Sequence, residues 1–154
     1  MAHMGNFDFS GMRQLQKELE KMQQNTDVFL EECAKELAAR LLRKVVKRTP
    51  VGQYSEGAKK QGGTLRRGWT GNKRSSAQKY AESLAVRRFG GNYVVEVTNP
   101  VEYASYVEYG HRTVNHRGWV PGRFMMKISE QEIEQAAPQI LERKIQKFME
   151  GAFR

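Results

Sequence analysis

Cysteine is almost missing from this chain of 154 residues, in which Cys33 is the only one. A single cysteine cannot form an internal disulfide, so the composition is typical of a protein that folds in a reducing compartment. Leu30 and Leu37 lie at helical spacing on either side of Cys33. This pattern predicts a buried structural thiol rather than a reactive nucleophile.

Long hydrophobic runs are also missing. No segment approaches the roughly 18 apolar residues that a membrane span requires, and the first residues lack the apolar core of a signal peptide. Residues 1–4 (MAHM) have the form of a cloning scar before a native start at Met4. Hydrophobic residues make up 39% of the chain and charged residues 28%. This composition indicates a soluble, single globular domain over residues 5–154, with no membrane partner.

Catalytic and metal-binding motifs are missing as well. The sequence contains no nucleophile elbow, P-loop or zincin motif, and its glycine pairs do not introduce a helix that would hold a phosphate. His111 and His116 offer two ligands, whereas a zinc site needs about four. Glu108 lies near many arginines and is expected to form a structural ion pair rather than act as a general base. We therefore expect no enzymatic activity, no cofactor and no bound metal.

Acidic residues are scarce in one part of the chain. Residues 40–90 hold 14 lysines and arginines but only Glu56 and Glu82, in a chain whose net charge is +9. Such a segment suits a polyanion, an acidic protein surface or the wall of a DNA channel. An ordinary solvated loop is the alternative. Trp69 is expected to pack in the core rather than stack on nucleic acid. The candidate residues for an interface or a DNA lumen are Lys59, Lys60, Arg66, Arg67, Lys73 and Arg74.

Two long segments have helical periodicity. Residues 11–48 carry apolar residues at a 4-3-4-3-4 spacing, which indicates that one face of a helix packs against a partner. The polar residues 25–27 predict a kink or a break, and Thr49 before Pro50 predicts the end of the helix. Residues 123–149 predict a second helix. It is expected to restart at residues 129–132, which have capping-box form, and to kink at Pro138.

The middle of the chain has β patterning. Alternation predicts a short strand at residues 64–70 and a hairpin over residues 82–98, and residues 101–109 fit a short helix. Flexible loops are predicted at residues 50–63, 71–78 and 110–118. Together the elements predict an α+β fold. In it, a small, mainly antiparallel sheet of three to four strands packs against long N-terminal and C-terminal helices.

Four segments together resemble a known family. Residues 49–52 (TPVG) and 63–69 (GTLRRGW) resemble a signature that follows the first helix in that family. Residues 103–110 (YASYVEYG) are similar to its tyrosine-to-glycine motif, and residues 120–125 (VPGRFM) are similar to the segment that leads into its last helix. The family is that of small tail-completion or head–tail joining proteins, minor tail components of long-tailed phages and related prophages.

The resemblance implies a structural virion protein rather than an enzyme. It implies a subunit made in the bacterial cytoplasm and built into the neck or tail of the particle. There it would form a ring, commonly six-fold, between the head connector and the tail tube or its terminator. The residues that match the motifs are expected to be structural: Tyr103, Tyr106, Glu108, Gly110, Pro121 and Phe124. Tyr103, Tyr106 and Val107 share a helical face that can cover the sheet. If DNA passes through the ring, the protein is expected to contact only the backbone of the DNA. The alternative function is that of a sequence-nonspecific nucleic-acid-binding protein.

Overall fold

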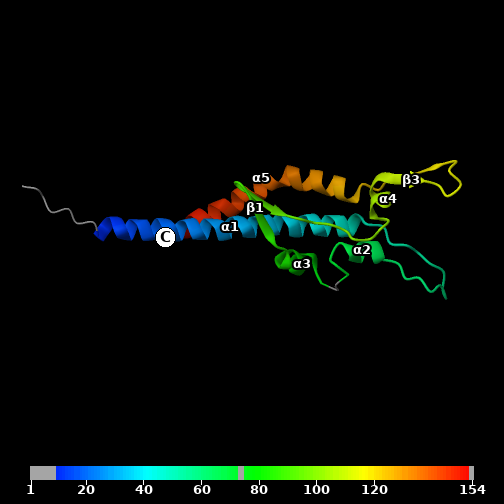
Figure 1. Ribbon diagram of the computed structural model, residues 1–154, viewed down its shortest axis with the longest axis horizontal. Coiled ribbons are helices and arrows are strands. Elements are labelled where there is room, and N and C mark those ends of the chain that lie inside the picture. Colours follow the sequence, from blue (N-terminus) through cyan, green and yellow to red (C-terminus); the bar gives the residue numbers. More distant parts are fainter. Residues whose placement is uncertain (1–9, 73–74, 153–154) are drawn as a thin grey trace, which may run out of the picture.

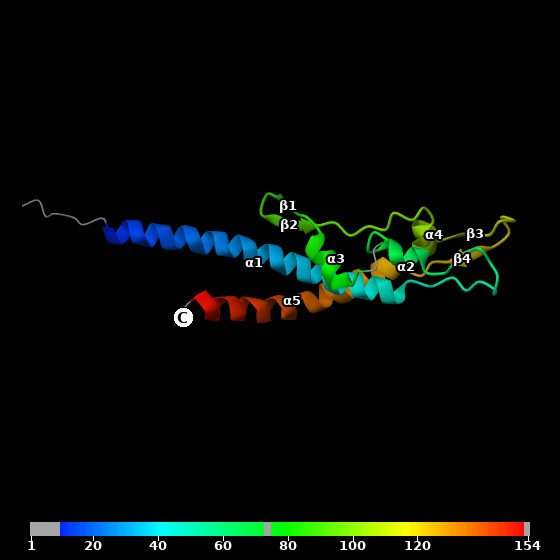
Figure 2. The ribbon, with the colours of Figure 1, turned by 90° about the horizontal axis from the view of Figure 1, so that it is seen from below.

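Two long helices dominate the computed structural model, which describes residues 10–72 and 75–152. Helix α1 (Ser10–Arg48) is about 58 Å long at 1.5 Å per residue. Helix α5 (Met125–Ala152) runs back alongside it, as Figures 1 and 2 show. The predictions for residues 1–4, Lys73 and Arg74 lie outside the described residues.

Helix α1 is continuous, so the predicted break at residues 25–27 is wrong. The Thr26 hydroxyl donates to the carbonyl of Met22 at 2.8 Å, which allows a threonine to lie inside a helix without interrupting its backbone ladder. The end of the helix is as predicted. The Thr49 N–H closes the last turn on the Val45 carbonyl, and Pro50 prevents a further turn.

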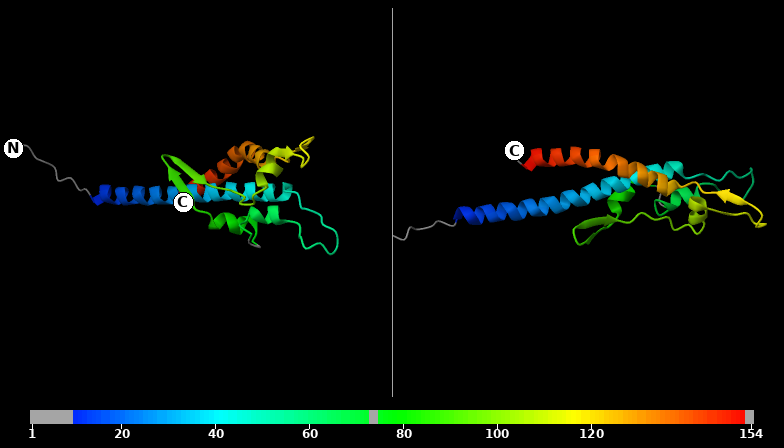
Figure 3. Two further views of the ribbon diagram at one scale, coloured as in Figure 1. Left: turned by 45° about the vertical axis from the view of Figure 1, so that its right-hand side comes forward. Right: turned by 90° about the horizontal axis from the view of Figure 1, so that it is seen from above.

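Helix α5 begins at Met125 and continues through residue 129 without a restart. The restart that the capping-box form predicted is therefore wrong. The Ser129 hydroxyl instead donates to the Met125 carbonyl within the helix and accepts from Arg48. Glu132, the other half of the predicted box, forms ion pairs with Lys44 and Arg48 on α1. The tertiary partners thus outweigh the local capping pattern. Pro138 lies inside the helix, which changes direction along its length (Figure 3).

Four strands form two separate hairpins. Strands β1 (Val86–Phe89) and β2 (Asn92–Val95) pair antiparallel across a Gly-Gly turn. Strands β3 (Gly110–Arg112) and β4 (Trp119–Pro121) form the second pair, which takes up part of the predicted loop 110–118. The α+β class with long terminal helices is confirmed. The four strands make two small antiparallel sheets rather than one.

Residues 64–70 do not form the predicted strand. Thr64–Gly68 is helix α2, and Leu65 and Trp69 are both buried because a spacing of four places them on one face. Ala77–Ser83 is helix α3, capped by the Ser76 hydroxyl. This helix replaces the end of the predicted loop 71–78 and the start of the predicted hairpin at residue 82. Sequence reasoning missed both short helices because each is too short for a helical period to be distinguished from the alternation of a strand.

The core lies where the C-terminal half of α1 meets α2, α3 and the start of α5. Its fully buried members are small or aliphatic, with one indole: Ala38, Ala39, Leu42, Val45, Leu65, Trp69, Ala81 and Met125. The predicted burial of Trp69 and Cys33 is confirmed. Within the described residues, exposed large hydrophobic side chains outnumber the buried ones. Surface of this kind is typical of an assembly component. None of the described helices is long and apolar enough to cross a membrane.

The molecule has two contrasting ends. At one end, α1 continues past the end of α5 as a single helix, and residues 13–26 are all exposed there. We call residues 10–26 the protruding helix. At the other end, the loop 50–63 and the β3–β4 hairpin both project beyond the end of α1, and helix α4 (Ala104–Tyr109) lies at the base of the hairpin (Figures 1 and 3). We call this the distal end.

Candidate interaction surface at the distal end

Glu108 fixes the distal end to the rest of the fold. Its side chain is buried, and its two carboxylate oxygens accept from the backbone N–H groups of Met126 and Lys127, each at 2.9 Å. These N–H groups belong to the first turn of α5, where no carbonyl of the helix can reach them. A carboxylate at a helix N-terminus is favoured by the unpaired N–H groups and by the helix dipole. Glu108 is therefore a cap that joins α4 to α5.

The predicted ion pair of Glu108 with arginine is wrong. Among the described residues, the ion pairs do not include Glu108. Its main chain adds to the joint, since the Glu108 carbonyl accepts from the N–H of Phe124 at 3.0 Å. The Val107 carbonyl accepts from Arg123 at 2.7 Å. Phe124 has a φ of +49°, which is unusual for a bulky residue. The hydrogen bond from its N–H to the Glu108 carbonyl holds this conformation.

Two glycines allow the chain segments of this joint to meet. Gly110 has a φ of +90°, and a Cβ there would lie 2.5 Å from the carbonyl oxygen of Val120. A Cβ on Gly122 would lie 2.3 Å from the carbonyl oxygen of Glu108. Gly110 pairs with Pro121 at the base of the β3–β4 hairpin. The motif residues Glu108, Gly110, Pro121 and Phe124 thus meet in a single joint, which supports the structural role expected of them.

Aromatic side chains gather on the outside of this joint. Tyr106 is 59% exposed, Tyr109 65% and Trp119 61%, although each comes from an ordered helix or strand. Tyr109 packs edge-to-face on Phe124 with their ring centroids 6.5 Å apart. We call Tyr106, Tyr109, Trp119 and Phe124 the distal aromatic surface. Such a group of exposed rings on a monomer is typical of a protein-binding site.

The sequence predicted that Tyr103 and Tyr106 cover a sheet, and the structure shows that they do not. Tyr103 is 45% exposed, and it lies beside the loop 50–63 together with Tyr54. Val107 alone of the three predicted residues packs against the core. Helix α4 is only six residues long, and its tyrosines, Tyr106 and Tyr109, are both exposed.

The distal aromatic surface lies among positive charges. Glu108 is the only acid between residues 103 and 129, and it is buried. Exposed basic side chains in the same stretch are Arg112, Arg117, Arg123 and Lys127. The ammonium of Lys127 lies 5.7 Å from the centroid of the Phe124 ring. Aromatic rings with neighbouring arginines suit a partner of acidic or mixed surface.

The described residues of the predicted basic site have different partners. Arg66 donates to the carbonyl of Thr49, with its closer nitrogen at 2.8 Å, and so closes the C-terminal end of α1. Arg67 donates to the carbonyl of Gly62 at 3.2 Å. Lys59 and Lys60 are exposed on the loop 50–63. The structure therefore gives Arg66 a capping role at the end of α1.

The tryptophan of the same signature supports the α1 terminus from inside. The indole N–H of Trp69 donates to the Thr49 hydroxyl at 2.7 Å, and that hydroxyl donates to the Val45 carbonyl at 2.5 Å. Gly68 lies so close to Asn99 that a Cβ would be 2.2 Å from the Asn99 side-chain oxygen. The Leu-Arg-Arg-Gly-Trp signature thus packs α1, α2 and the segment before α4 together.

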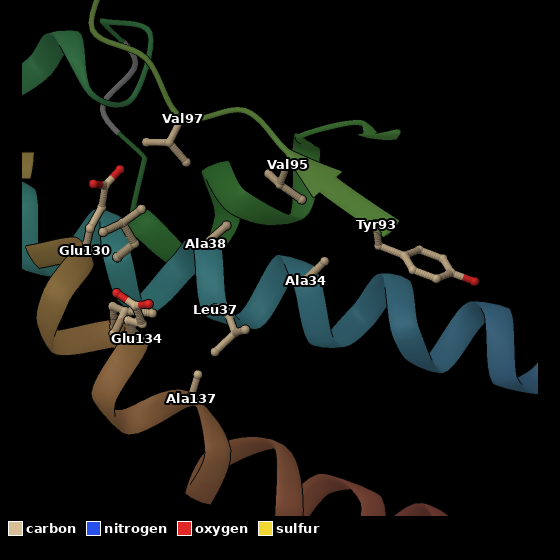
Figure 4. A pocket seen from close by; sticks show the side chains of 11 residues that line it. Ala34, Leu37, Ala38, Tyr93, Val95, Val97, Glu130, Glu134 and Ala137 are labelled. Carbon is tan, nitrogen blue, oxygen red and sulfur yellow. The ribbon is translucent and has the colours of Figure 1, made fainter. Parts of the chain in front are cut away.

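An apolar groove lies elsewhere, along α1 between β2 and α5 (Figure 4). It measures about 480 Å³, and its lining is mostly alanine, leucine, isoleucine and valine. Its charged members are Glu130 and Glu134, so it does not suit a nucleic acid. The two carboxylates have no nucleophile or histidine beside them, and this lining does not form a recognisable catalytic arrangement.

The histidines and the single thiol can be placed as well. No three His, Cys, Asp or Glu side chains of the described residues gather in a geometry that could hold a metal ion. His111 lies on β3 with its ring 6.0 Å from that of Tyr106, and His116 is exposed in the hairpin turn. Burial raises the pKa of the Cys33 thiol, which makes it less reactive.

Sequence reasoning missed Tyr109, Trp119 and Val114, the last of which is fully exposed at 100%. A signal was present, since an aromatic residue in a segment rich in glycine and arginine has few core positions available to it. The capping role of Glu108 had no local signal. The N–H groups that donate to it lie 18 and 19 residues further along the chain.

Comparison with known proteins gives one match. A family model described as "Bacteriophage HK97-gp10, putative tail-component" matches residues 13–110. The match covers more than half of the chain, from α1 to the end of the tyrosine-to-glycine motif. No curated protein matches, and no solved structure does.

Proposed function

Because the chain belongs to the HK97 gp10-like family of bacteriophage tail components, we propose that it completes the tail and joins it to the head. A structural tail component is not an enzyme and resides in the virion. In the proposed role, the protein is one copy of a six-fold ring at the neck. Its partners are other copies of itself, the head connector and the tail tube or its terminator.

The observation that carries this proposal is the distal aromatic surface. Interface hot spots are enriched in tyrosine, tryptophan and arginine, and these residue types surround the β3–β4 hairpin. The Glu108 cap and the close contact at Gly110 hold the rings in place, so little conformational entropy is lost when a partner binds. We assign the distal aromatic surface to the contact with a neighbouring ring of the neck.

The two projecting segments have different parts in this contact. The β3–β4 hairpin is paired and anchored to α5, which suits recognition. The loop 50–63 is exposed throughout residues 50–61 and carries Lys59 and Lys60, which suits ordering on contact with an acidic surface. These lysines are also the positions at which passing DNA would meet the protein through its phosphates.

Nonspecific nucleic-acid binding by the isolated chain is the alternative function. Its support is the exposed Lys59 and Lys60, and it is weakened because Arg66 and Arg67 bind carbonyl groups of their own chain. A mobility shift of DNA that falls steeply with salt would favour it. Retained joining activity in a phage with Lys59→Glu and Lys60→Glu would argue that DNA contact at the loop is not needed.

The test is complementation of the parent phage after deletion of the gene. We expect the deletion to leave filled heads and separate tails that do not join. The wild-type gene should restore joining, and Tyr109→Ser with Trp119→Ser should not. Phe89→Ser is the matched control, because Phe89 is exposed to 60%, almost as much as Trp119, but lies at the tip of the other hairpin.

Three measurements make the outcome decisive. Electron microscopy counts joined particles, and circular dichroism of each purified variant confirms that it folds. Packaged DNA content shows that head filling is intact. Normal virions from the double variant would overturn the assignment of the distal aromatic surface. Normal virions from the deletion would overturn the proposed function itself.

A further inference from the structure

The protruding helix carries a coiled-coil repeat. Leu15, Leu19, Met22, Thr26 and Phe29 follow one another at steps of four, three, four and three, which is the spacing of the a and d positions of a heptad. Leu15 is 54% exposed, Leu19 56% and Met22 43%. An apolar stripe of this kind on a single helix needs a second helix to cover it.

The same stripe is already a helix–helix interface further along α1. Phe29 stacks on Phe148 of α5 with ring centroids 4.4 Å apart, and Cys33, the next position of the repeat, is 5% exposed. Helix α5 covers the stripe only from Phe29 onward, because α5 ends at Ala152. Beyond that point α1 continues alone (Figure 2). The uncovered part is therefore continuous with a packed interface, and it is not an isolated patch.

The residues beside the stripe favour a second copy of the same helix. The e and g positions, which select coiled-coil partners, are Gln16, Glu18, Gln23 and Asn25, and Glu18 is the only charged one. Arg13, Lys17, Glu20 and Lys21 occupy outer positions of the heptad. Identical copies thus meet without a row of like charges. A partner of strongly acidic or basic surface would find little to pair with.

We propose that the protruding helices of neighbouring copies pack side by side, parallel and in register, as a short coiled coil within the ring. The parallel direction follows from two observations. Cyclic symmetry relates the copies of a ring by rotation, so helices that run along the ring axis point the same way. In a parallel pair Glu18 at g faces Gln23 at e, whereas an antiparallel pair places g opposite g and can bring two Glu18 side chains together.

The contact rests on the proposed function, because the ring supplies the symmetry and the local concentration. Helices of this length are marginal by themselves in water. Pairing accordingly stabilises both the helix and the contact between copies. It differs from the contact at the distal aromatic surface, which lies at the opposite end of α1 and faces another protein.

Disulfide trapping of the full chain tests the proposal. In a Cys33→Ala background, Leu15→Cys, Leu19→Cys and Met22→Cys are each oxidised separately, and Lys17→Cys on the outer face is the control. We expect each stripe variant to give at least about tenfold more cross-linked dimer than the control, because a and d positions face their own copies in a parallel pair. Yields no higher than that of Lys17→Cys would overturn the proposal.

A mixing experiment separates the two directions. Leu15→Cys and Thr26→Cys, at a d and an a position that meet in an antiparallel pair, carry tags of different size and are oxidised together. The parallel arrangement predicts homodimers of each and no excess of the mixed dimer. A predominant mixed dimer would overturn it in favour of an antiparallel pair. Cross-linking can fail while Tyr109→Ser with Trp119→Ser still blocks joining, and that result would remove the coiled coil and leave the proposed function standing.

Discussion

The two ends of the molecule expose apolar side chains for different reasons. The distal aromatic surface is held by contacts between segments far apart in sequence, above all the hydrogen bonds from Met126 and Lys127 to Glu108. The protruding helix is held by its own backbone and by local pairs such as Gln14 with Glu18. One end is rigid before it meets a partner, and the other depends on a partner for much of its stability. Substitutions of the residues that hold the distal end together should therefore affect folding, whereas those on the protruding helix should affect assembly.

The largest expected effect on stability is at Glu108. Glu108→Ala removes two hydrogen bonds to a charged group and leaves two N–H groups of α5 unpaired, so we expect a loss of about 2–3 kcal/mol in the free energy of unfolding. Glu130→Ala is the control, because Glu130 is exposed on the same helix, and it should change the value by less than about 0.5 kcal/mol. Urea denaturation measures both. Equal midpoints would show that the distal end is not held by this cap.

A smaller loss is expected at Arg66. Arg66→Ala removes the cap on the Thr49 carbonyl and should cost about 1 kcal/mol. Lys59→Ala should be close to neutral, because Lys59 is exposed on the loop. Thermal denaturation at neutral pH compares the two variants. An unchanged melting temperature for Arg66→Ala would return Arg66 to the surface role that the sequence predicted.

The middle of the molecule, between the two ends, should respond to acid. Hydrogen bonds from Arg48 and Lys44 lower the pKa of Glu132. Burial opposes a similar shift at Glu36, but hydrogen bonds from Lys144 and Arg40 outweigh it and lower that pKa too. A lowered folded-state pKa adds stability above the unfolded value of about 4.5. That stability is lost as the pH falls through the folded value.

The expected result is a melting temperature that is steady near neutral pH and declines below about pH 4.5. Glu132→Gln should lower the melting temperature at pH 7, and its effect should shrink as the pH falls through the lowered folded pKa of Glu132 and the wild-type carboxylate becomes protonated. The measurement is the difference in melting temperature between the wild type and Glu132→Gln, followed from neutral to acidic pH. A constant difference at all pH values would show that the ion pairs between α1 and α5 do not carry the dependence.

The smallest effect on folding is expected in the protruding helix. Leu19→Ser should change the stability of the isolated chain by no more than about 0.5 kcal/mol, since the side chain is 56% exposed and makes no core contact. Val45→Ser, at a fully buried position on the same helix, should cost several times more. Comparable losses for the two variants would mean that the stripe is already covered in the single chain.

The features that the sequence predicted well were those determined by residues close together. The long helices, the hairpin at its Gly-Gly turn, the helix before Gly110, and the burial of Cys33 and Trp69 all follow from periodicity or local turn chemistry. The stripe on α1 was also visible, but the sequence did not indicate that α5 would cover only its second half. That limit depends on where α5 ends relative to Phe29, which is a property of the fold.

The features that were missed depend on distant partners. Glu108 was placed beside arginines, yet it caps a helix that begins 17 residues later, at Met125. Arg66 was expected at an interface, and the sequence did not indicate that its guanidinium would bind the Thr49 carbonyl, 17 residues earlier. The short helices α2 and α3 were read as strand and loop because five to seven residues do not establish a period. Tertiary contact decided each of these cases.

Cryo-electron microscopy of the parent phage neck tests the central claim, that both ends are assembly contacts, most directly. The account predicts a closed ring of this chain between the head connector and the tail. In that ring, the distal aromatic surface is buried against another protein, and residues 13–26 of adjacent copies lie parallel and in contact. A neck without the chain, or a ring in which Trp119 and Leu19 both face solvent, would contradict it.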